Sequence, residues 1–246
     1  MSAVAVMLIA MGIADGCRRM FRPRRLALGL GPVIVVVIAA LSALWHRGDI
    51  VLLMIAAAAV VGWEWLSIRS ERSGEQEAAP LVVFAAAVAV LIVSSGWGSH
   101  AGGLVGRWCR WTALPLHHVD ATKLLMVVGV VALQLVTGNQ LVRLVLGSVG
   151  AVKPEGQPQP SDRLKGGRLL GPMERLLILG LGLGGQLAAA TAVVAAKSII
   201  RFPEINAAKA RVNGNIGIDD VTEYFLVGSF ASWLLAFGSL ALVRAV

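Results

Sequence analysis

Charged residues are scarce in this chain of 246 residues. Asp, Glu, Lys and Arg make up 15% of it, whereas soluble domains usually carry about 25%. Hydrophobic residues reach 57% and the mean hydropathy is +0.77. Several apolar runs approach the roughly 20 residues that a transmembrane helix needs. These features exclude an ordinary soluble domain and predict an integral membrane protein.

Acidic residues are fewer than basic ones, which leaves a formal net charge of +8. In a soluble protein this charge would indicate nucleic-acid binding. Here the arginines cluster in short segments beside apolar runs, as cytoplasmic anchors on an anionic lipid leaflet do. We therefore expect no nucleic-acid partner. We expect a multi-pass protein of the bacterial cytoplasmic (inner) membrane, with membrane lipids as its partners.

Cysteine is nearly absent, with only Cys17 and Cys109. Two cysteines are too few for a four-cysteine zinc site, and their predicted positions on opposite sides of the membrane disfavour a disulfide. The sequence also lacks HExxH, GxSxG and CxxC motifs, so we expect no cofactor. The N-terminus lacks the basic region of a cleavable signal, so we expect its first apolar run to be retained.

The apolar runs predict an all-α fold, a polytopic transmembrane helical bundle of about seven spans. Residues 1–150 are expected to form an N-terminal transmembrane region of about five spans, residues 151–171 a polar linker, and residues 172–246 a C-terminal two-span region. The predicted spans cover about 2–16, which is short, then 26–45, 50–67, 80–97, 122–136, 173–196 and 222–243. Residues 98–121 are expected to be a loop or an interfacial segment.

Two features leave the order of the spans after residue 122 open. Thr137-Gly138-Asn139 indicates a break at the end of the fifth span. Seven crossings would put the N-terminus outside and the C-terminus inside. They would also put the basic segment 197–221 outside, against the trend for positive residues to stay in the cytoplasm.

Five arginines after the first apolar run give the strongest orientation signal. We expect them to anchor the chain on lipid at the cytoplasmic face. They are Arg18, Arg19, Arg22, Arg24 and Arg25.

Small residues recur at helical spacing in the two C-terminal spans. Gly180 and Gly184 form a GxxxG pair, and Gly228, Ser232 and Ala236 repeat every four positions. Such faces allow helix backbones to approach closely. They predict packing within the bundle, or contact with a second copy or another protein partner.

Polar residues gather around the sixth predicted span and the start of the last one. Lys197 and Arg201 are four residues apart and share a helical face. Charges at membrane depth are costly, so this cluster either binds an anionic head group or a translocated ion, or anchors the span ends at the interface. Its members are Glu174, Arg175, Gln186, Lys197, Ser198, Arg201, Glu204, Glu223 and Tyr224.

Two more carboxylates, Asp15 and Glu64, lie within or beside apolar runs. We expect both at the cytoplasmic interface near the arginines. Buried positions would instead make them candidates for a proton relay.

Three histidines and one aspartate come close together in the segment before the fifth span. Imidazole and carboxylate are suitable zinc ligands, but adjacent histidines lack the spacing of a helical site. They are weak metal candidates: His100, His117, His118 and Asp120.

The C-terminal third carries a recognisable pattern. It consists of ERLLI (174–178), Gly185-Gln186, AAKSIIRFPEI (195–205) and TEYFLVGSFASWLLAF (222–237). This pattern resembles the C-terminal region of the DUF3307 group of uncharacterised bacterial integral membrane proteins. The resemblance implies that the polar cluster acts as one unit, but it implies no activity.

Three functional hypotheses follow. The first is a non-enzymatic transport, channel-like or partner-subunit component, because polar groups border the spans and catalytic spacing is absent. The second is a membrane-embedded enzyme acting on a lipid or its head group through Glu174, Glu204 and Glu223. The third is a lipid-binding scaffold held by the arginines.

Overall fold

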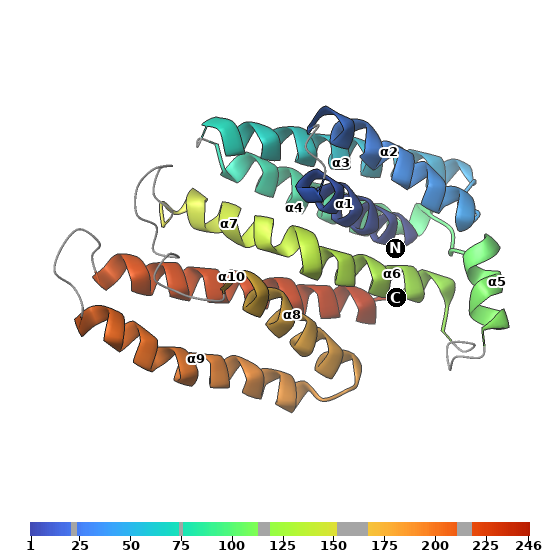
Figure 1. Cartoon of the computed structure of the whole chain (residues 1–246). Coiled ribbons are helices and arrows are strands. Elements are labelled where there is room, and N and C mark those ends of the chain that lie inside the picture. Colours follow the sequence, from blue (N-terminus) through green and yellow to red (C-terminus); the bar gives the residue numbers. More distant parts are fainter. Residues whose placement is uncertain (21–23, 74–75, 113–118, 152–166, 211–217) are drawn as a thin grey trace.

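The computed structural model of the chain describes all residues except 21–23, 74–75, 113–118, 152–166 and 211–217 (Figure 1). The side chains of residues 24–28, 72–73, 167–169, 198, 200–210 and 218–221 also lie outside the description. Every element in the described ranges is a helix. Most of the predicted linker therefore falls on residues that the structure does not describe.

The N-terminal part of the chain supplies five helices and one short 3-10 turn. These are α1 (Ser2–Met20), α2 (Arg24–Leu41), α3 (Arg47–Ser73), α4 (Ala78–Val93), η1 (Ser94–Trp97) and α5 (Gly103–Trp111). The rest of the chain supplies α6 (Ala121–Ala132), the π-helical turn η2 (Leu133–Thr137), α7 (Gly138–Ser148), α8 (Gly167–Leu183), α9 (Leu187–Ala210) and α10 (Ile218–Arg244).

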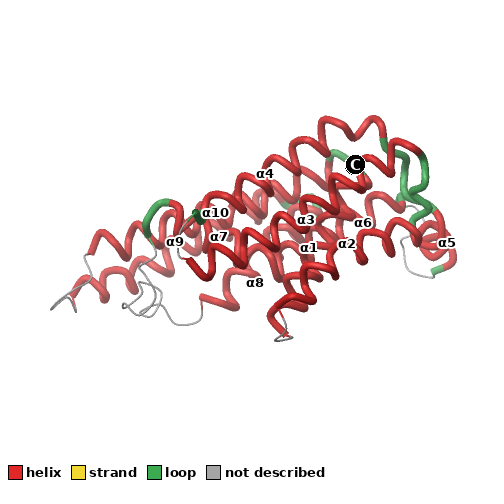
Figure 2. The backbone as a smooth tube through the Cα atoms, turned by 90° about the horizontal axis from the view of Figure 1, so that it is seen from above, coloured by secondary structure: helices red, strands yellow, loops and turns green. Residues whose placement is uncertain are grey.

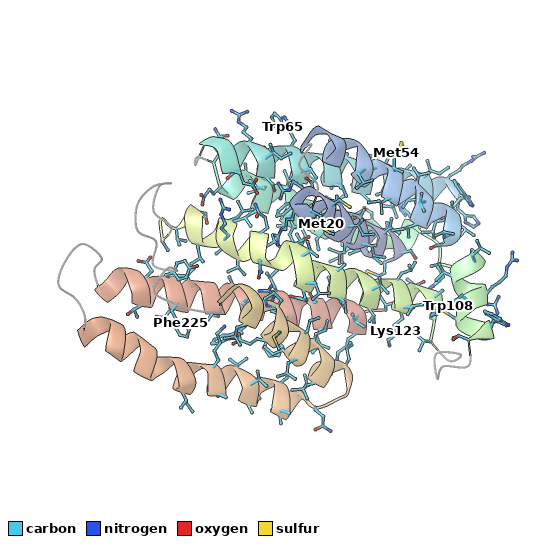
Figure 3. The ribbon with its side chains drawn as sticks, in the orientation of Figure 1. Met20, Met54, Trp65, Trp108, Lys123 and Phe225 are labelled. Carbon is cyan, nitrogen blue, oxygen red and sulfur yellow. The ribbon has the colours of Figure 1, made fainter. Side chains whose placement is uncertain are left out.

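Within the described ranges, four helical stretches are long and apolar enough to cross a membrane. They are Arg47–Glu71, Ala78–Trp97, Ala121–Ser148 and Thr222–Arg244. The prediction of an all-helical membrane protein is therefore confirmed at this level. Met54 and Trp65 of α3 point away from the bundle (Figure 3) and are 60% and 51% exposed, as expected for side chains that face lipid.

The first helix, α1, lies at the centre of the N-terminal bundle. It packs against α2, α3 and α6 and against the π turn, and every residue from Ser2 to Gly12 is buried. Gly12 and Gly129 let α1 and α6 approach closely, because a Cβ on Gly12 would lie 2.8 Å from the Cβ of Ala132. The segment that the sequence marks as a short span is thus a core helix, apolar on all sides because all sides are covered.

The fifth predicted span continues without a break. A single rod of α6, η2 and α7 runs from Ala121 to Ser148, so the break expected at Thr137-Gly138-Asn139 is wrong. The chain absorbs the irregularity as one π turn, in which Gly138 donates its backbone N–H to the carbonyl of Leu133, five residues back. A π turn widens the helix without ending it.

The sixth predicted span is wrong in a different way. It is two helices, α8 and α9, that pack against each other as a hairpin (Figure 1). The α8 helix ends in a Schellman motif: Gln186 N–H bonds to Leu181 C=O, and Gly185 N–H bonds to Gly182 C=O. Gly185 has φ +78°, a conformation that only glycine adopts at little cost.

Helix directions alternate along the chain (Figure 1). The helices α1, α3, the α6–α7 rod and α9 run one way, and α2, α4, α8 and α10 run the other. The final residues of α1, α3, α7 and α9 therefore lie toward one end of the bundle, here called the basic end. Both chain termini lie toward the other end, and α5 also lies there when the bundle is seen from above (Figure 2).

Hydrogen bonds tie the start of α1 to its neighbours. Ser2 Oγ donates to the carbonyl of Ser99 at 2.8 Å, and Ser99 in turn donates through N–H and Oγ to Asp49 at 2.7 and 2.6 Å. Asp49 also accepts from the backbone N–H of His46 at 3.1 Å. This network fixes the register of α1 against α3, which positions the polar residues at the other end of α1.

Candidate functional site

Two buried polar clusters lie on either side of the π turn. The first, here called the carboxylate cluster, joins α1 and α3 to the turn. Its charged members are Asp15, Arg18, Glu64 and Glu71. The second, here called the arginine cluster, joins α8 and α10 to the turn. Its members are Arg175, Gln134, Asn139, Ser232 and Ser239.

Asp15 is the best-satisfied member of the carboxylate cluster. Its side chain is fully buried. It accepts a hydrogen bond from Thr137 Oγ1 at 2.7 Å, from Trp63 Nε1 at 3.2 Å and from Arg18 Nη2 at 3.1 Å. A carboxylate that accepts three such bonds is stabilised in its charged form. Asp15 thus joins α1, α3 and the π turn through donors from each of them.

Arg18 lies among three carboxylates and is only 6% exposed at its side chain. Its Nε lies 3.6 Å from Glu64 Oε2, and its Nη1 lies 3.5 Å from Glu71 Oε1. The prediction that Arg18 anchors lipid is wrong, because its guanidinium points into the bundle. Removing each of these charges from water costs free energy. The attraction between the buried guanidinium and the buried carboxylates offsets part of that cost.

Glu64 is the least satisfied member. Its side chain is 1% exposed, and neither carboxyl oxygen accepts a hydrogen bond from a residue that the structure describes. Both Asp15 and Glu64 contact Arg18, as expected of acids near the arginines, and both are buried inside the bundle. Glu71, 24% exposed at its side chain, is the outermost carboxylate of the cluster and accepts from Gln140 Nε2 at 3.2 Å.

Arg175 organises the second cluster and is 1% exposed. Its Nη2 donates to the backbone carbonyl of Gln134 at 3.0 Å and to Asn139 Oδ1 at 2.7 Å. Its Nη1 donates to Ser232 Oγ at 3.3 Å. All three acceptors are uncharged, so this guanidinium is held by dipoles.

The π turn explains why a backbone carbonyl can take part. Where hydrogen bonds span five residues, a carbonyl of the turn loses its usual partner four residues on. The carbonyl of Gln134 then becomes available to Arg175. The absence of a side chain at Gly138 makes room, since a Cβ there would lie 3.1 Å from Arg175 Nε and Nη2.

Gln134 links the arginine cluster to the last helix. Its Nε2 donates to Ser239 Oγ at 2.7 Å and to the carbonyl of Leu235 at 3.0 Å. The small-residue face of α10 is confirmed as a packing face: Ser232 and Ala236 are buried, and Gly228 faces Leu146 of α7. Gly180 and Gly184 are instead exposed, and a Cβ on Gly180 would meet nothing within 4 Å. The GxxxG prediction at these two glycines is therefore wrong within this chain.

The polar cluster predicted from sequence is divided by the hairpin. Glu174 and Lys197 form an ion pair across it, each largely buried. Arg175 faces the arginine cluster, and Gln186 is exposed in the turn between the two helices. Glu223 is exposed and Tyr224 half-buried on α10. Ser198, Arg201 and Glu204 belong to α9, but their side chains lie outside the described set.

The other predicted sites are mostly exposed or undescribed. Arg19 is exposed. Arg22 is outside the described residues, and so are the side chains of Arg24 and Arg25. His100 Nδ1 lies 3.8 Å from Asp120 Oδ2, with both side chains largely exposed, while Asp120 also caps α6 by accepting from the N–H of Thr122 at 3.2 Å.

The metal prediction gains no support from this geometry. His117 and His118 fall in the undescribed segment, and no group of three metal-binding side chains occurs in the part of the chain that the structure describes. The amphipathic helix α5 occupies part of the segment expected to be interfacial. It exposes Trp108, which is labelled in Figure 3, and Trp111, which are 46% and 85% exposed. Cys109 of the same helix is buried.

Sequence reasoning missed Gln134, Asn139, Thr137 and Gln140 as members of the site. The available signal was Gln134, a polar residue inside the apolar run of the fifth span.

Comparisons of the chain with protein-family models, with curated proteins and with solved structures return no match.

Proposed function

We propose that the protein is a non-enzymatic membrane component that binds and moves an ion or a small charged solute. The observation that supports this most is the burial of charged groups on both sides of the π turn, halfway along the Ala121–Ser148 span. Ionisable residues at membrane depth are costly and are kept mainly where a substrate or ion pathway needs them. The two clusters carry opposite charge, which suits a path for charged species.

The proposed setting is the bacterial inner membrane, with the basic end in the cytoplasm. The alternating helix directions support this orientation, because the chain leaves α1 and α9 at the same end, where the sequence is richest in arginine and lysine (Figure 1). The hairpin of α8 and α9 adds one reversal to the predicted topology. The C-terminus then lies outside with the N-terminus, and the basic segment 197–221 returns to the cytoplasmic side, in keeping with the positive-inside trend.

The proposal also covers the number of times the chain crosses the membrane. The sequence predicts about seven, and four stretches meet the length and hydropathy of a span. We assign further crossings to α1, α2 and the hairpin. The short helix α8, with 17 residues, is long enough for roughly 25 Å of membrane at 1.5 Å per residue. Membrane lipid would then cover exposed apolar side chains such as Leu177 and Leu183.

The resemblance to the DUF3307 group remains part of the proposal. It implies that the polar cluster predicted from sequence acts as one unit, and the ion pair of Glu174 with Lys197 supports that. A protein partner or a second copy would find an open small-residue surface at Gly180 and Gly184, which are exposed.

Reconstitution tests the proposed activity. Purified protein in vesicles of phosphatidylethanolamine and phosphatidylglycerol is assayed for flux of protons, sodium, potassium, chloride and phosphate, with protein-free vesicles as the baseline. We expect protein-dependent flux of at least one ion, reduced by Arg175→Gln. Lys123→Gln, an exposed position on the same rod, should leave it unchanged. Baseline flux for every ion, or equal flux in wild type and Arg175→Gln, would contradict the proposal.

A further inference from the structure

Among the side chains that the structure describes, the carboxylate cluster holds more acids than bases. Three carboxyl groups, those of Asp15, Glu64 and Glu71, surround the single guanidinium of Arg18. Other charged groups near the cluster lie on α3 itself or on the helices packed on it. On α3, Arg69 is exposed and its guanidinium lies 5.6 Å from the centroid of the Trp65 ring, while the side chain of Arg72 is outside the description. α4 has no titratable residue, and the only ones of α2, Arg24 and Arg25, have side chains outside the description.

The α6–α7 rod carries two cations, Lys123, which is exposed, and Arg143, which lies near Glu77. The groups of the rod that hydrogen-bond to the cluster are neutral. Thr137 of the π turn donates to Asp15, and Gln140 of α7 donates to Glu71. No neutral donor reaches Glu64 among the described residues, because both of its oxygens lack a hydrogen-bond partner. The donors of the cluster thus serve Asp15 and Glu71, which leaves Glu64 without stabilisation for a negative charge beyond the single contact with Arg18 at 3.6 Å.

A buried carboxyl without donors is stable as the neutral acid. Two carboxyls in one site with such different surroundings take opposite protonation states. We propose that the carboxylate cluster is a proton-binding site in which Glu64 carries the proton and Asp15 the permanent negative charge. The proton comes from water and forms an O–H bond on the Glu64 carboxyl, which removes one negative charge from the cluster.

The cluster has a route to water at its outer member. Glu71 is 24% exposed, contacts Arg18 and lies about two helical turns beyond Glu64 on α3. It lies toward the basic end, which the proposed topology places in the cytoplasm. This inference deepens the proposed function and rests on it for the identity of the moving ion, since it makes the proton that ion.

Infrared spectroscopy reads the proton directly. The carbonyl stretch of a protonated carboxylic acid is separate from the bands of a carboxylate, and it shifts when the acid proton is exchanged for deuterium. At neutral pH we expect wild-type protein in vesicles to show one such band that Glu64→Gln removes and Glu64→Asp retains. Glu223→Gln, an exposed carboxyl outside both clusters, serves as the matched control and should retain the band.

The two proposals fail separately. If wild type lacks the band at neutral pH, or if Glu64→Gln keeps it, the proton site is wrong even where ion flux is measured. If the band behaves as expected but no ion moves in vesicles, the site stands and the proposed function fails. Elution as a single species and an unchanged helical circular dichroism spectrum establish that each variant is folded. If Glu64→Gln does not fold, loss of the band in Glu64→Ala or its retention in Glu64→Asp decides the question.

Discussion

The N-terminal bundle around α1 and the C-terminal hairpin of α8 and α9 start from similar sequences but end in different surroundings. Both are apolar, contain glycines and carry a few charges. The residues of α1 from Ser2 to Gly12 are all buried, whereas the hairpin exposes Leu177, Leu183 and Leu187. The two regions differ in how far neighbours surround them: α1 packs against α2, α3, α4, α6 and the π turn, whereas α9, the outer helix of the hairpin, packs on α8 and α10.

Charge is handled differently in the two regions. In the bundle, Arg18 is surrounded by carboxylates. At the hairpin, Arg175 is held by the neutral oxygens of Gln134, Asn139 and Ser232. A buried ion pair leaves an unpaired charge when one partner is removed, but removing a dipole-solvated charge leaves only neutral groups unsatisfied. Substitutions in the two clusters should therefore differ in cost.

The largest effect is expected at Arg18. Replacing it in Arg18→Met leaves Asp15 as a buried anion without its cation, which should lower the free energy of unfolding by about 3–5 kcal/mol. Chemical unfolding in detergent micelles measures this. Arg19→Met, at the exposed neighbour, is the control and should change little; an equal loss in both variants would show that Arg18 is not paired as described.

Replacing Arg175 should lower the free energy of unfolding by less than replacing Arg18. Arg175→Met removes hydrogen bonds to three neutral acceptors and the desolvation cost of the charge together, so we expect a loss of about 2–3 kcal/mol. The same unfolding measurement applies, with Arg244→Met for comparison, since Arg244 donates a single bond to the carbonyl of Gly182 at 3.0 Å. A loss at Arg175 that exceeds the loss at Arg18 would reverse the comparison.

Glycine substitutions compare the packing of the two regions. Gly12→Ala places a Cβ 2.8 Å from the Cβ of Ala132, and the resulting overpacking should cost about 1–2 kcal/mol. Gly180→Ala adds a methyl group in open space and should be neutral or slightly stabilising, because alanine favours the helix over glycine. Thermal unfolding of both variants in one detergent checks this, and a destabilised Gly180→Ala would reveal a neighbour such as a second copy.

The smallest effect concerns Glu77, which precedes α4 and lies against Gly147 of α7. Burial raises the pKa of Glu77, and nearby Arg143 offsets part of that rise. A raised pKa in the folded state means that stability is highest while the group is protonated and falls as the pH rises through the folded-state pKa. The melting temperature of wild type relative to Glu77→Gln should therefore fall from acidic to neutral pH. A constant difference would place Glu77 in water.

The sequence predicted the helical class because a bilayer leaves long apolar runs few alternatives. It also predicted the packing face of Gly228, Ser232 and Ala236, since helical spacing alone determines which residues share a face. It failed at Gly184-Gly185-Gln186, where the turn lies inside an apolar run. The polar residues that normally mark a turn are missing there, except for Gln186.

The turn between α8 and α9 also determines which residues of the predicted polar cluster are in contact. Glu174 and Lys197 lie 23 residues apart, so a straight helix would separate them by roughly 35 Å at 1.5 Å per residue. The hairpin brings them into contact. The π turn was equally hidden, because Leu133–Thr137 has no distinctive composition, yet it frees the carbonyl that Arg175 uses. Such features depend on tertiary packing, which the pattern of residues along one helix does not contain.

Asp15 and Glu64 have similar positions in the sequence, since each is an acid at the end of an apolar run. Asp15 precedes the arginines, and Glu64 lies between two tryptophans. Their roles differ because Asp15 receives three donors and Glu64 receives none from the described residues. Partners 48 and 122 residues away along the chain, Trp63 and Thr137, decide this. The sequence thus identifies the two acids, whereas their tertiary contacts determine which of them is charged.

The most direct test of this account compares the unfolding free energies of Asp15→Asn and Glu64→Gln at neutral pH in the same detergent. Asp15→Asn removes the charge that three donors stabilise and should cost about 2–3 kcal/mol. Glu64→Gln replaces a carboxyl that is already neutral and should change the free energy by less than about 1 kcal/mol. Equal losses, or a greater loss in Glu64→Gln, would contradict the account, because Glu64 would then carry a charge that the protein stabilises.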